Sequence, residues 1–190
     1  PIGSIIPDGP INRGFDYYHG FHHAKDMKAV IVNDKVVLYD DEINMLPRLT
    51  NKSVEYINTQ AKNKDGKPFF LYVPLGSPHT PIVPSKEWQG KSGMGDYADF
   101  VMQTDATVGA ITKALKDNGL SENTLVIFTS DNGTSKAADI EGLAKQGHIV
   151  SAGYRGSKSD LWDGGHRVPF IVKWPNKVKP NSTNDALICL

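Results

Sequence analysis

The sequence has little cysteine, no excess of charge of either sign and no long apolar run. Cys189 is the single cysteine among 190 residues, which excludes an internal disulfide framework and a cysteine-rich zinc site. The 21 Lys and Arg residues balance the 21 Asp and Glu residues, so a nucleic-acid partner bound through a broad basic surface is not expected. The longest apolar runs, residues 69–73 and 125–128, are far shorter than the roughly 20 residues of a transmembrane helix, and no membrane span is expected.

The two ends of the chain also lack expected features. The N-terminus has no initiator methionine, no basic region and no apolar leader segment, and the C-terminus stops on the apolar residues 187–190. From these ends we expect an internal piece of a longer protein. The composition, 39% hydrophobic and 22% charged, is typical of a folded globular domain.

Hydrophobic patterning predicts a hairpin and a helix in the first third of the chain. Residues 29–32 and 35–39 read as short strands joined by a tight Asn-Asp turn. Apolar spacing over residues 49–62 predicts a helix, with Thr50 or Asn51 as its N-cap.

The strongest helical pattern covers residues 96–116, where apolar side chains recur at steps of three and four. Asp96 is the predicted N-cap, and Gly119 supplies a left-handed stop. Buried strands are expected at residues 69–73, 124–129 and 168–172. Strands that alternate with an amphipathic helix predict an α/β fold with a mostly parallel mixed sheet flanked by helices.

Polar segments follow two of these strands, where ligands bind in α/β sheets. After the first strand comes SPHTP at residues 77–81, in which His79 lies between two prolines. A histidine on a restricted backbone suits proton transfer, although a stiffened surface loop would have the same sequence. After the second strand, Asp131 and Asn132 offer hard oxygen ligands that suit Ca²⁺ or Mg²⁺, and the same residues also suit a plain turn.

A third segment precedes the last strand and combines basic residues with glycine. It runs RGSK at residues 155–158 and WDGGHRVP at residues 162–169. Glycine gives backbone room and Lys or Arg gives fixed positive charge, which together suit a tetrahedral anion. A solvated glycine-rich loop is the alternative.

In their order and spacing these segments resemble the sulfatase family of the alkaline-phosphatase-like superfamily, most closely its bacterial arylsulfatase branch. The matching stretches are residues 14–20, 68–81, 99–105, 128–133 and 158–169, and the resemblance extends over nearly the whole chain. The resemblance implies an alkaline-phosphatase-like sulfatase fold, present here incompletely. It also implies an arylsulfatase-like sulfuric ester hydrolase that acts on small-molecule or carbohydrate sulfate monoesters.

The resemblance also implies roles for individual residues. Asp131 and Asn132 match metal ligands, with Ca²⁺ in preference to Mg²⁺. His79 matches a histidine that contacts the sulfate ester and protonates the leaving oxygen, and Lys158 matches the lysine that binds the sulfate oxygens. His148 is a further candidate at the rim of the substrate pocket. The residues that match the loop holding the lysine are Asp163, Gly164, Gly165 and Arg167, with Asp163 standing where the family more often has Glu.

One departure from the family pattern concerns the nucleophile. Sulfatases need the Cys or Ser of a Cys/Ser-x-Pro/Ala-x-Arg segment in a form oxidised to formylglycine, and the sequence contains no such segment. The paired aspartates that supply further metal ligands are absent too, and we interpret Asp40 and Asp41 as a solvated charge pair. We therefore expect residues 1–190 to be a partial catalytic domain without its N-terminal nucleophile segment and its C-terminal subdomain, and to be inactive alone.

Two other functions stay open at this point. One is a phosphomonoesterase or phosphonate hydrolase of the same superfamily, and the other is a noncatalytic carbohydrate-binding fragment. A periplasmic or secreted location is expected from the resemblance alone.

Overall fold

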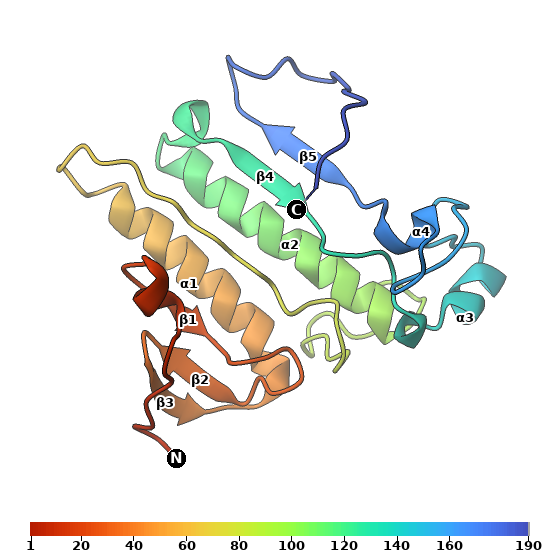
Figure 1. The fold of residues 1–190 in the computed structure, drawn as a ribbon, viewed down its shortest axis with the longest axis horizontal. Helices are drawn as coiled ribbons and strands as arrows, with labels where there is room; N and C mark the ends of the chain where they lie inside the picture. Colours follow the sequence, from red (N-terminus) through yellow and green to blue (C-terminus); the bar gives the residue numbers. More distant parts are fainter. Residues whose placement is uncertain (190) are drawn as a thin grey trace. The chain divides into compact units, whose positions relative to one another are not determined.

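The structure, a computed structural model, describes residues 1–189, and these form two compact units. The first unit is Pro1–Ala114 and the second is Leu115–Leu190. The boundary falls inside the helix α2 (Asp96–Asp117), labelled in Figure 1.

The first unit contains a small antiparallel sheet in the order β1 (His19–Gly20), β2 (Ala29–Val32) and β3 (Lys35–Tyr39). The predicted hairpin is thereby confirmed. Asn33 in its turn has a φ of 57°, and the Asn33 side chain accepts a hydrogen bond from the backbone N–H of Tyr18 at 3.1 Å. An asparagine tolerates this left-handed conformation better than most residues, which explains the tight turn.

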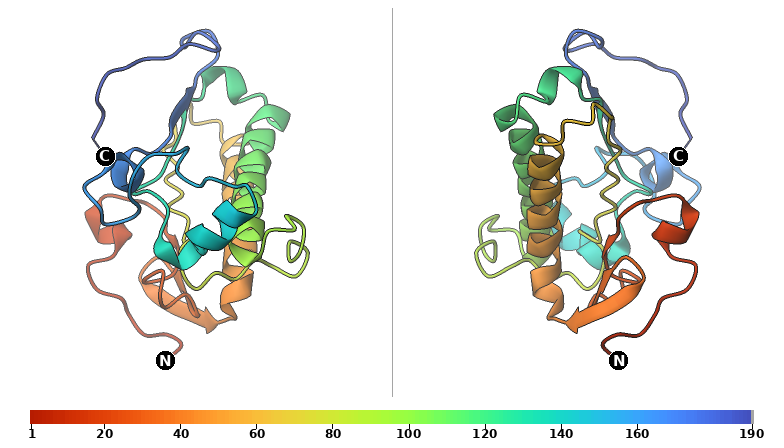
Figure 2. Two further views of the ribbon diagram at one scale, coloured as in Figure 1. Left: turned by 90° about the vertical axis from the view of Figure 1, so that its right-hand side faces the viewer. Right: turned by 90° about the vertical axis from the view of Figure 1, so that its left-hand side faces the viewer.

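Helix α1 (Met45–Gln60), the orange helix in Figure 2, contacts β1 and begins four residues before the predicted start. The expected N-caps are therefore wrong: the Thr50 hydroxyl donates to the carbonyl oxygen of Leu46 at 2.8 Å, inside the helix. Met45 and Leu46 are both buried. Burial of these two side chains adds a first turn that local capping signals do not reveal.

The core of the first unit lies between the sheet and α1. Its buried members are Met27, Val30 and Met45, and the half-buried side chains packed against them are Phe21, Leu38, Leu49 and Val83. These side chains come from both elements and from the loops between them, so the sheet and the helix fold around one apolar cluster.

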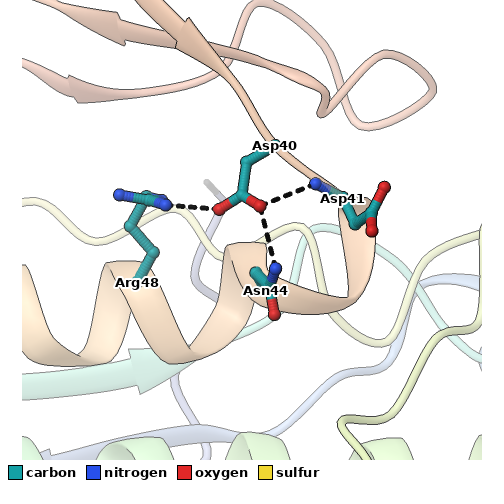
Figure 3. A network of polar contacts seen from close by, with 4 residues as sticks. All are labelled: Asp40, Asp41, Asn44 and Arg48. Atoms are coloured by element: carbon teal, nitrogen blue, oxygen red, sulfur yellow. Dashed lines mark hydrogen bonds and ion pairs between the residues drawn. The ribbon is translucent and has the colours of Figure 1, made fainter.

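A polar network joins the end of β3 to α1 (Figure 3). The carboxylate of Asp40 accepts hydrogen bonds at 2.8 Å from the Asn44 side chain and from the backbone N–H of Asp41, and it forms an ion pair with Arg48. The Asn44 and Arg48 hydrogen bonds hold the pKa of Asp40 below its usual value. Asp40 is therefore an anchored carboxylate, which corrects the prediction of a solvated charge pair, whereas Asp41 is exposed.

The predicted long helix is confirmed as α2. Its buried Asp99 accepts hydrogen bonds from the backbone N–H groups of Gly90 at 2.6 Å and Ser92 at 2.7 Å, so this carboxylate fixes the preceding loop. After the helix, Gly119 adopts the predicted left-handed conformation with a φ of 68°. Three short 3₁₀ segments, Pro10–Arg13, Glu42–Asn44 and Ser121–Asn123, complete the connections of these elements.

The segment 69–73 is not paired as a strand within residues 1–189, and every ladder in them is antiparallel. The parallel part of the predicted sheet is thus not formed in these residues. Phe70 and Tyr72 are 74% and 64% exposed. Two large apolar side chains left open to solvent fit a segment whose sequence favours a buried strand but which here has no hydrogen-bonded neighbour.

In the second unit, β4 (Val126–Thr129) pairs with β5 (Phe170–Lys173). The two strands run antiparallel, as the arrows in Figure 1 show. Three short helical segments, Lys136–Ala138, α3 (Ile140–Lys145) and α4 (Asp163–His166), lie between them in the chain. None of the helices in residues 1–189 combines the length and the apolar character that a membrane span requires.

His19 of β1 is an unusual feature of the first unit. Both of its ring nitrogens are buried and have no hydrogen-bond partner among the described residues. Burial, reinforced by the nearby positive charges of Lys52 and Arg48 on α1, lowers the pKa of His19, and Glu55 opposes this only in part. The folded protein therefore binds a proton here less readily than the unfolded chain.

The sign of this difference predicts acid sensitivity of the fold. The unfolded chain takes up a proton near pH 6.5, so the free energy of unfolding should fall as the pH drops below about 6.5 and level off below the folded pKa. Denaturant unfolding of the protein at pH 7.5 and at pH 5 measures this fall. The variant His19→Gln should lose part of it, whereas His22→Gln, at an exposed position, should retain it. An unchanged pH dependence in His19→Gln would contradict this interpretation.

Candidate functional site

The direction of β5 decides which loops meet in the second unit. In the antiparallel register, Thr129 at the end of β4 pairs with Phe170 at the start of β5. The segment that follows β4 and the segment that precedes β5 therefore leave the sheet at the same edge. These two segments carry Asp131, Asn132 and Lys158, as expected for a strand at 168–172 that runs antiparallel to the strand at 124–129.

The oxygen donors of Asp131 and Asn132 are available in this segment. The Asp131 carboxylate is exposed and makes no hydrogen bond or ion pair within residues 1–189. The Asn132 side chain donates its NH₂ group to the carbonyl oxygen of Gly133 at 3.0 Å, which leaves its own oxygen free to accept. Two hard oxygens on adjacent residues fit Ca²⁺ chemically, but they are only part of the six to eight ligands that Ca²⁺ typically takes.

The acidic and histidine side chains do not complete such a site by themselves. Within residues 1–189, no group of three or more His, Cys, Asp or Glu side chains is arranged to hold a metal ion. Any cation bound at Asp131 and Asn132 thus needs further oxygen ligands.

Lys158 is fixed through its backbone, and its ammonium group is free. The Lys158 N–H donates to the carbonyl oxygen of Thr134 at 2.9 Å. This bond joins the lysine loop, residues 155–164, directly to the segment after Asn132. On the preceding side, the backbone N–H of buried Ser157 donates to the Asp160 carboxylate at 2.8 Å. No carboxylate within residues 1–189 forms an ion pair with the Lys158 ammonium, so this charge is available to an anion.

Backbone contacts at glycine hold the two segments together. The Gly133 N–H donates to the carbonyl oxygen of Gly165 at 2.9 Å. A Cβ atom on Gly133 would overlap the carbonyl oxygen of Gly164, and a Cβ atom on Gly164 would overlap that of Gly156. Three chain segments therefore pack backbone against backbone, and side chains at these positions would separate them.

Asp163 and Arg167 stabilise α4 at the base of the lysine loop. Their side chains form an ion pair with a separation of 3.5 Å, and the backbone N–H of Arg167 donates to the carbonyl oxygen of Asp163 at 2.8 Å. The Arg167 guanidinium also stacks over the ring of Tyr154 at 4.6 Å. Neither charged group contacts the Lys158 side chain through a hydrogen bond or ion pair in the described residues.

His79 belongs to the first unit, where its loop is attached to α2. The hydroxyl groups of Ser77 and Thr104 are hydrogen-bonded at 2.8 Å, and the His79 N–H donates to the carbonyl oxygen of Gly76 at 2.9 Å. The ring nitrogen Nδ1 lies 2.6 Å from the carbonyl oxygen of Thr80. Because a carbonyl oxygen only accepts, Nδ1 carries a proton and Nε2 is the nitrogen left for exchange with another group.

The second unit also contains His148, the remaining predicted site residue. His148 lies after α3, is exposed, and its ring makes no hydrogen bond with residues 1–189.

A cavity of about 420 Å³ adjoins the lysine loop. Its lining residues are Lys136, Asp139, Ile140, Glu141, Gly156 and Ser157. The charged residues at 136–141 lie beside the lysine loop because of the fold, and no motif in the sequence predicts this.

The glycine contacts predict a large stability difference between two matched substitutions. Gly164→Ala should destabilise the protein by about 1–3 kcal/mol, because the backbone of residue 156 must move to admit the methyl group. Gly109→Ala, within α2 and in open space, should stabilise it by up to about 1 kcal/mol. Denaturant unfolding gives both values. Equal stabilities of the two variants would mean that the three segments are not in close contact.

Comparison with known proteins agrees with these observations. The family model "Sulfatase" matches residues 7–188. An N-acetylgalactosamine-6-O-sulfatase of Bacteroides thetaiotaomicron is 39% identical over 150 residues, which cover 77% of this chain and 28% of that protein. Human steryl-sulfatase is 34% identical over 175 residues, which cover 90% of this chain and 28% of that protein. This chain thus spans a little over a quarter of the length of these relatives.

Solved structures give the same result for the fold. The crystal structure of Ps i-CgsB superposes with a TM-score of 0.72 and 25% identity over 90% of this chain and 42% of that one. A sulfatase structure from a study of glycosaminoglycan metabolism in Bacteroides thetaiotaomicron superposes with a TM-score of 0.68 and 29% identity over 95% of this chain and 40% of that one. The α/β fold predicted from the sequence is the fold of these sulfatases, and the chain belongs to the sulfatase family.

Proposed function

We propose that this chain is part of the catalytic domain of a sulfatase that hydrolyses sulfate monoesters, and that it contributes the sulfate-binding lysine and part of a calcium site. The observation that carries the proposal is the free ammonium group of Lys158 on a loop bonded directly to the segment of Asp131 and Asn132. A fixed cation beside hard oxygen ligands suits an anionic tetrahedral group, such as the sulfate of a monoester, shared between a metal and a lysine.

In this proposal Lys158 binds the sulfate oxygens and neutralises charge that increases in the transition state. Asp131 and Asn132 would hold a Ca²⁺ ion, which when bound supplies further positive charge next to the sulfate. The formylglycine nucleophile of the family is absent from this chain and would come from another segment of the enzyme.

His79 would protonate the leaving oxygen. Its Nδ1–H is engaged by the carbonyl oxygen of Thr80, so the proton to be donated would be the Nε2–H of the imidazolium form. As the ester S–O bond breaks, the leaving oxygen would take this proton and depart as an alcohol, and the ring would be left as a neutral imidazole.

The substrate class we propose is a carbohydrate sulfate. Support comes from relatives: one is named an N-acetylgalactosamine-6-O-sulfatase, and a solved structure with 25% identity holds a neocarrahexaose. His148 would then lie at the pocket rim. A periplasmic or secreted location is part of the same proposal, and fractionation of the producing cells tests it.

Replacement of Lys158 tests the proposal directly. In the full-length enzyme, Lys158→Ala should lower kcat/KM for an aryl sulfate by about 10²–10³-fold, since one charge-stabilising group is lost. Lys177→Ala removes an exposed lysine of the same unit that lies outside this site and should leave kcat/KM nearly unchanged. Similar activities of the two variants would exclude Lys158 from sulfate binding. Residues 1–190 alone should give no turnover.

Replacement of His79 tests the proton transfer. His79→Ala should reduce hydrolysis of an alkyl sulfate by about 10²–10⁴-fold, because an alkoxide needs a proton as it leaves. It should reduce hydrolysis of nitrophenyl sulfate much less, since nitrophenolate leaves without one. The readout is the ratio of the two losses in kcat. Equal losses on both substrates would make His79 a substrate-binding residue instead.

A further inference from the structure

Arg155 and Trp162 lie on either side of Lys158 in the chain and meet in space. The Arg155 guanidinium carbon is 3.7 Å from the centre of the Trp162 ring. Close to this stack, the backbone N–H of Gly164 donates to the carbonyl oxygen of Arg155 at 2.8 Å. The stack and this hydrogen bond bring the two ends of residues 155–164 together, so that these residues form a closed loop that carries Lys158.

Neither side chain forms a hydrogen bond or an ion pair within residues 1–189. Trp162 is 52% exposed, so it is not a core residue. Within these residues, the aromatic contact of the Arg155 side chain is with the ring of Trp162. A cation held over an indole ring gains about 0.5–2 kcal/mol, which is enough to bias an exposed loop toward one conformation.

In the described part of the chain, the other anchors of the loop bond it to the segment after β4 only at Lys158 itself. The Lys158 N–H is bonded to Thr134, and the contacts between Ser157 and Asp160 make a local turn. No hydrogen bond within residues 1–189 joins Ser159, Leu161 or Trp162 to β4 or β5. The carbonyl oxygens of Leu161 and Trp162 are bonded to α4, to His166 Nε2 at 3.0 Å and to the Gly165 N–H at 2.7 Å. Without the stack, this half of the loop is held by these two bonds and by the Gly164 N–H bond to Arg155.

We propose that Arg155 and Trp162 form a clasp, defined as this stacked pair, that holds the Lys158 ammonium in position for the substrate sulfate. Both are positioning residues, and the inference rests on the proposed function of Lys158. A displacement of about 1 Å of a charge-stabilising group can cost about 10²-fold in rate, so loosening the loop should lower activity without unfolding the protein.

The test compares variants of the full-length enzyme on an aryl sulfate. Arg155→Ala and Trp162→Leu should each lower kcat/KM about 10- to 100-fold, and the double variant should lose little more, because both changes open the same clasp. Trp162→Phe keeps a ring for stacking and should recover most of the activity. Lys91→Ala, which removes a lysine stacked on Trp88 in the other unit, is the matched control and should change nothing.

Two readouts separate positioning from other roles. The amide of Lys158 should exchange hydrogen faster in Trp162→Leu, while the melting temperature stays near that of the parent protein. If Arg155→Ala lowers kcat/KM and Trp162→Leu does not, Arg155 contacts the substrate itself and the clasp is overturned. The clasp is also overturned if the fold-losses of the two single variants multiply in the double variant.

A final pair of variants distinguishes failure of the clasp from failure of the proposed function. If Lys158→Ala lowers kcat/KM by the predicted factor and Trp162→Leu adds no further loss in that background, the clasp acts through Lys158. If Lys158→Ala lowers activity but Trp162→Leu in the parent enzyme does not, the clasp alone is wrong. If Lys158→Ala retains full activity, the proposed function fails first.

Discussion

The antiparallel pairing of β4 with β5 is the constraint on which the site in the second unit depends. Its register joins Thr129 to Phe170, so a segment that leaves one strand and a segment that enters the other share one edge. In a parallel pair, the start of the last strand would lie at the opposite edge, and Lys158 would be a strand's length away from Asp131. The direction of a four-residue strand therefore decides whether a lysine and a pair of oxygen ligands can act on one anion.

Close backbone approach turns this shared edge into a defined geometry. Gly133 and Gly164 have no room for a side chain, and hydrogen bonds from Gly133 to Gly165 and from Lys158 to Thr134 bridge the same two segments. A charged lysine on a long flexible stem is a poor anion site unless its backbone is fixed. The glycine contacts and the stacked pair proposed above supply that restraint together.

Local signals in the sequence predicted the hairpin, the long helix α2 and the strands β4 and β5, because each depends on a turn residue or an apolar period within the segment itself. The start of α1 was predicted too late, since Met45 and Leu46 join the helix through burial in the core. The segment 69–73 has the composition of a buried strand, but pairing needs a neighbour that the segment cannot specify.

The candidate site was predicted from motifs, and its contacts were not. The types and order of Asp131, Asn132 and Lys158 pointed to an anion and a hard metal ion. That Gly133 touches Gly164 depends on the approach of two segments far apart in the sequence, which no local pattern encodes. Residues that act through backbone contacts are invisible in a sequence when only side-chain chemistry is considered.

The most direct test of this account is a crystal structure of the full-length protein with Ca²⁺ and a non-hydrolysable sulfate ester analogue. The account predicts a cation about 2.3–2.6 Å from oxygens of Asp131 and Asn132, and sulfate oxygens within hydrogen-bond distance of the Lys158 ammonium. A cation bound elsewhere, or a sulfate group that does not contact Lys158, would contradict it.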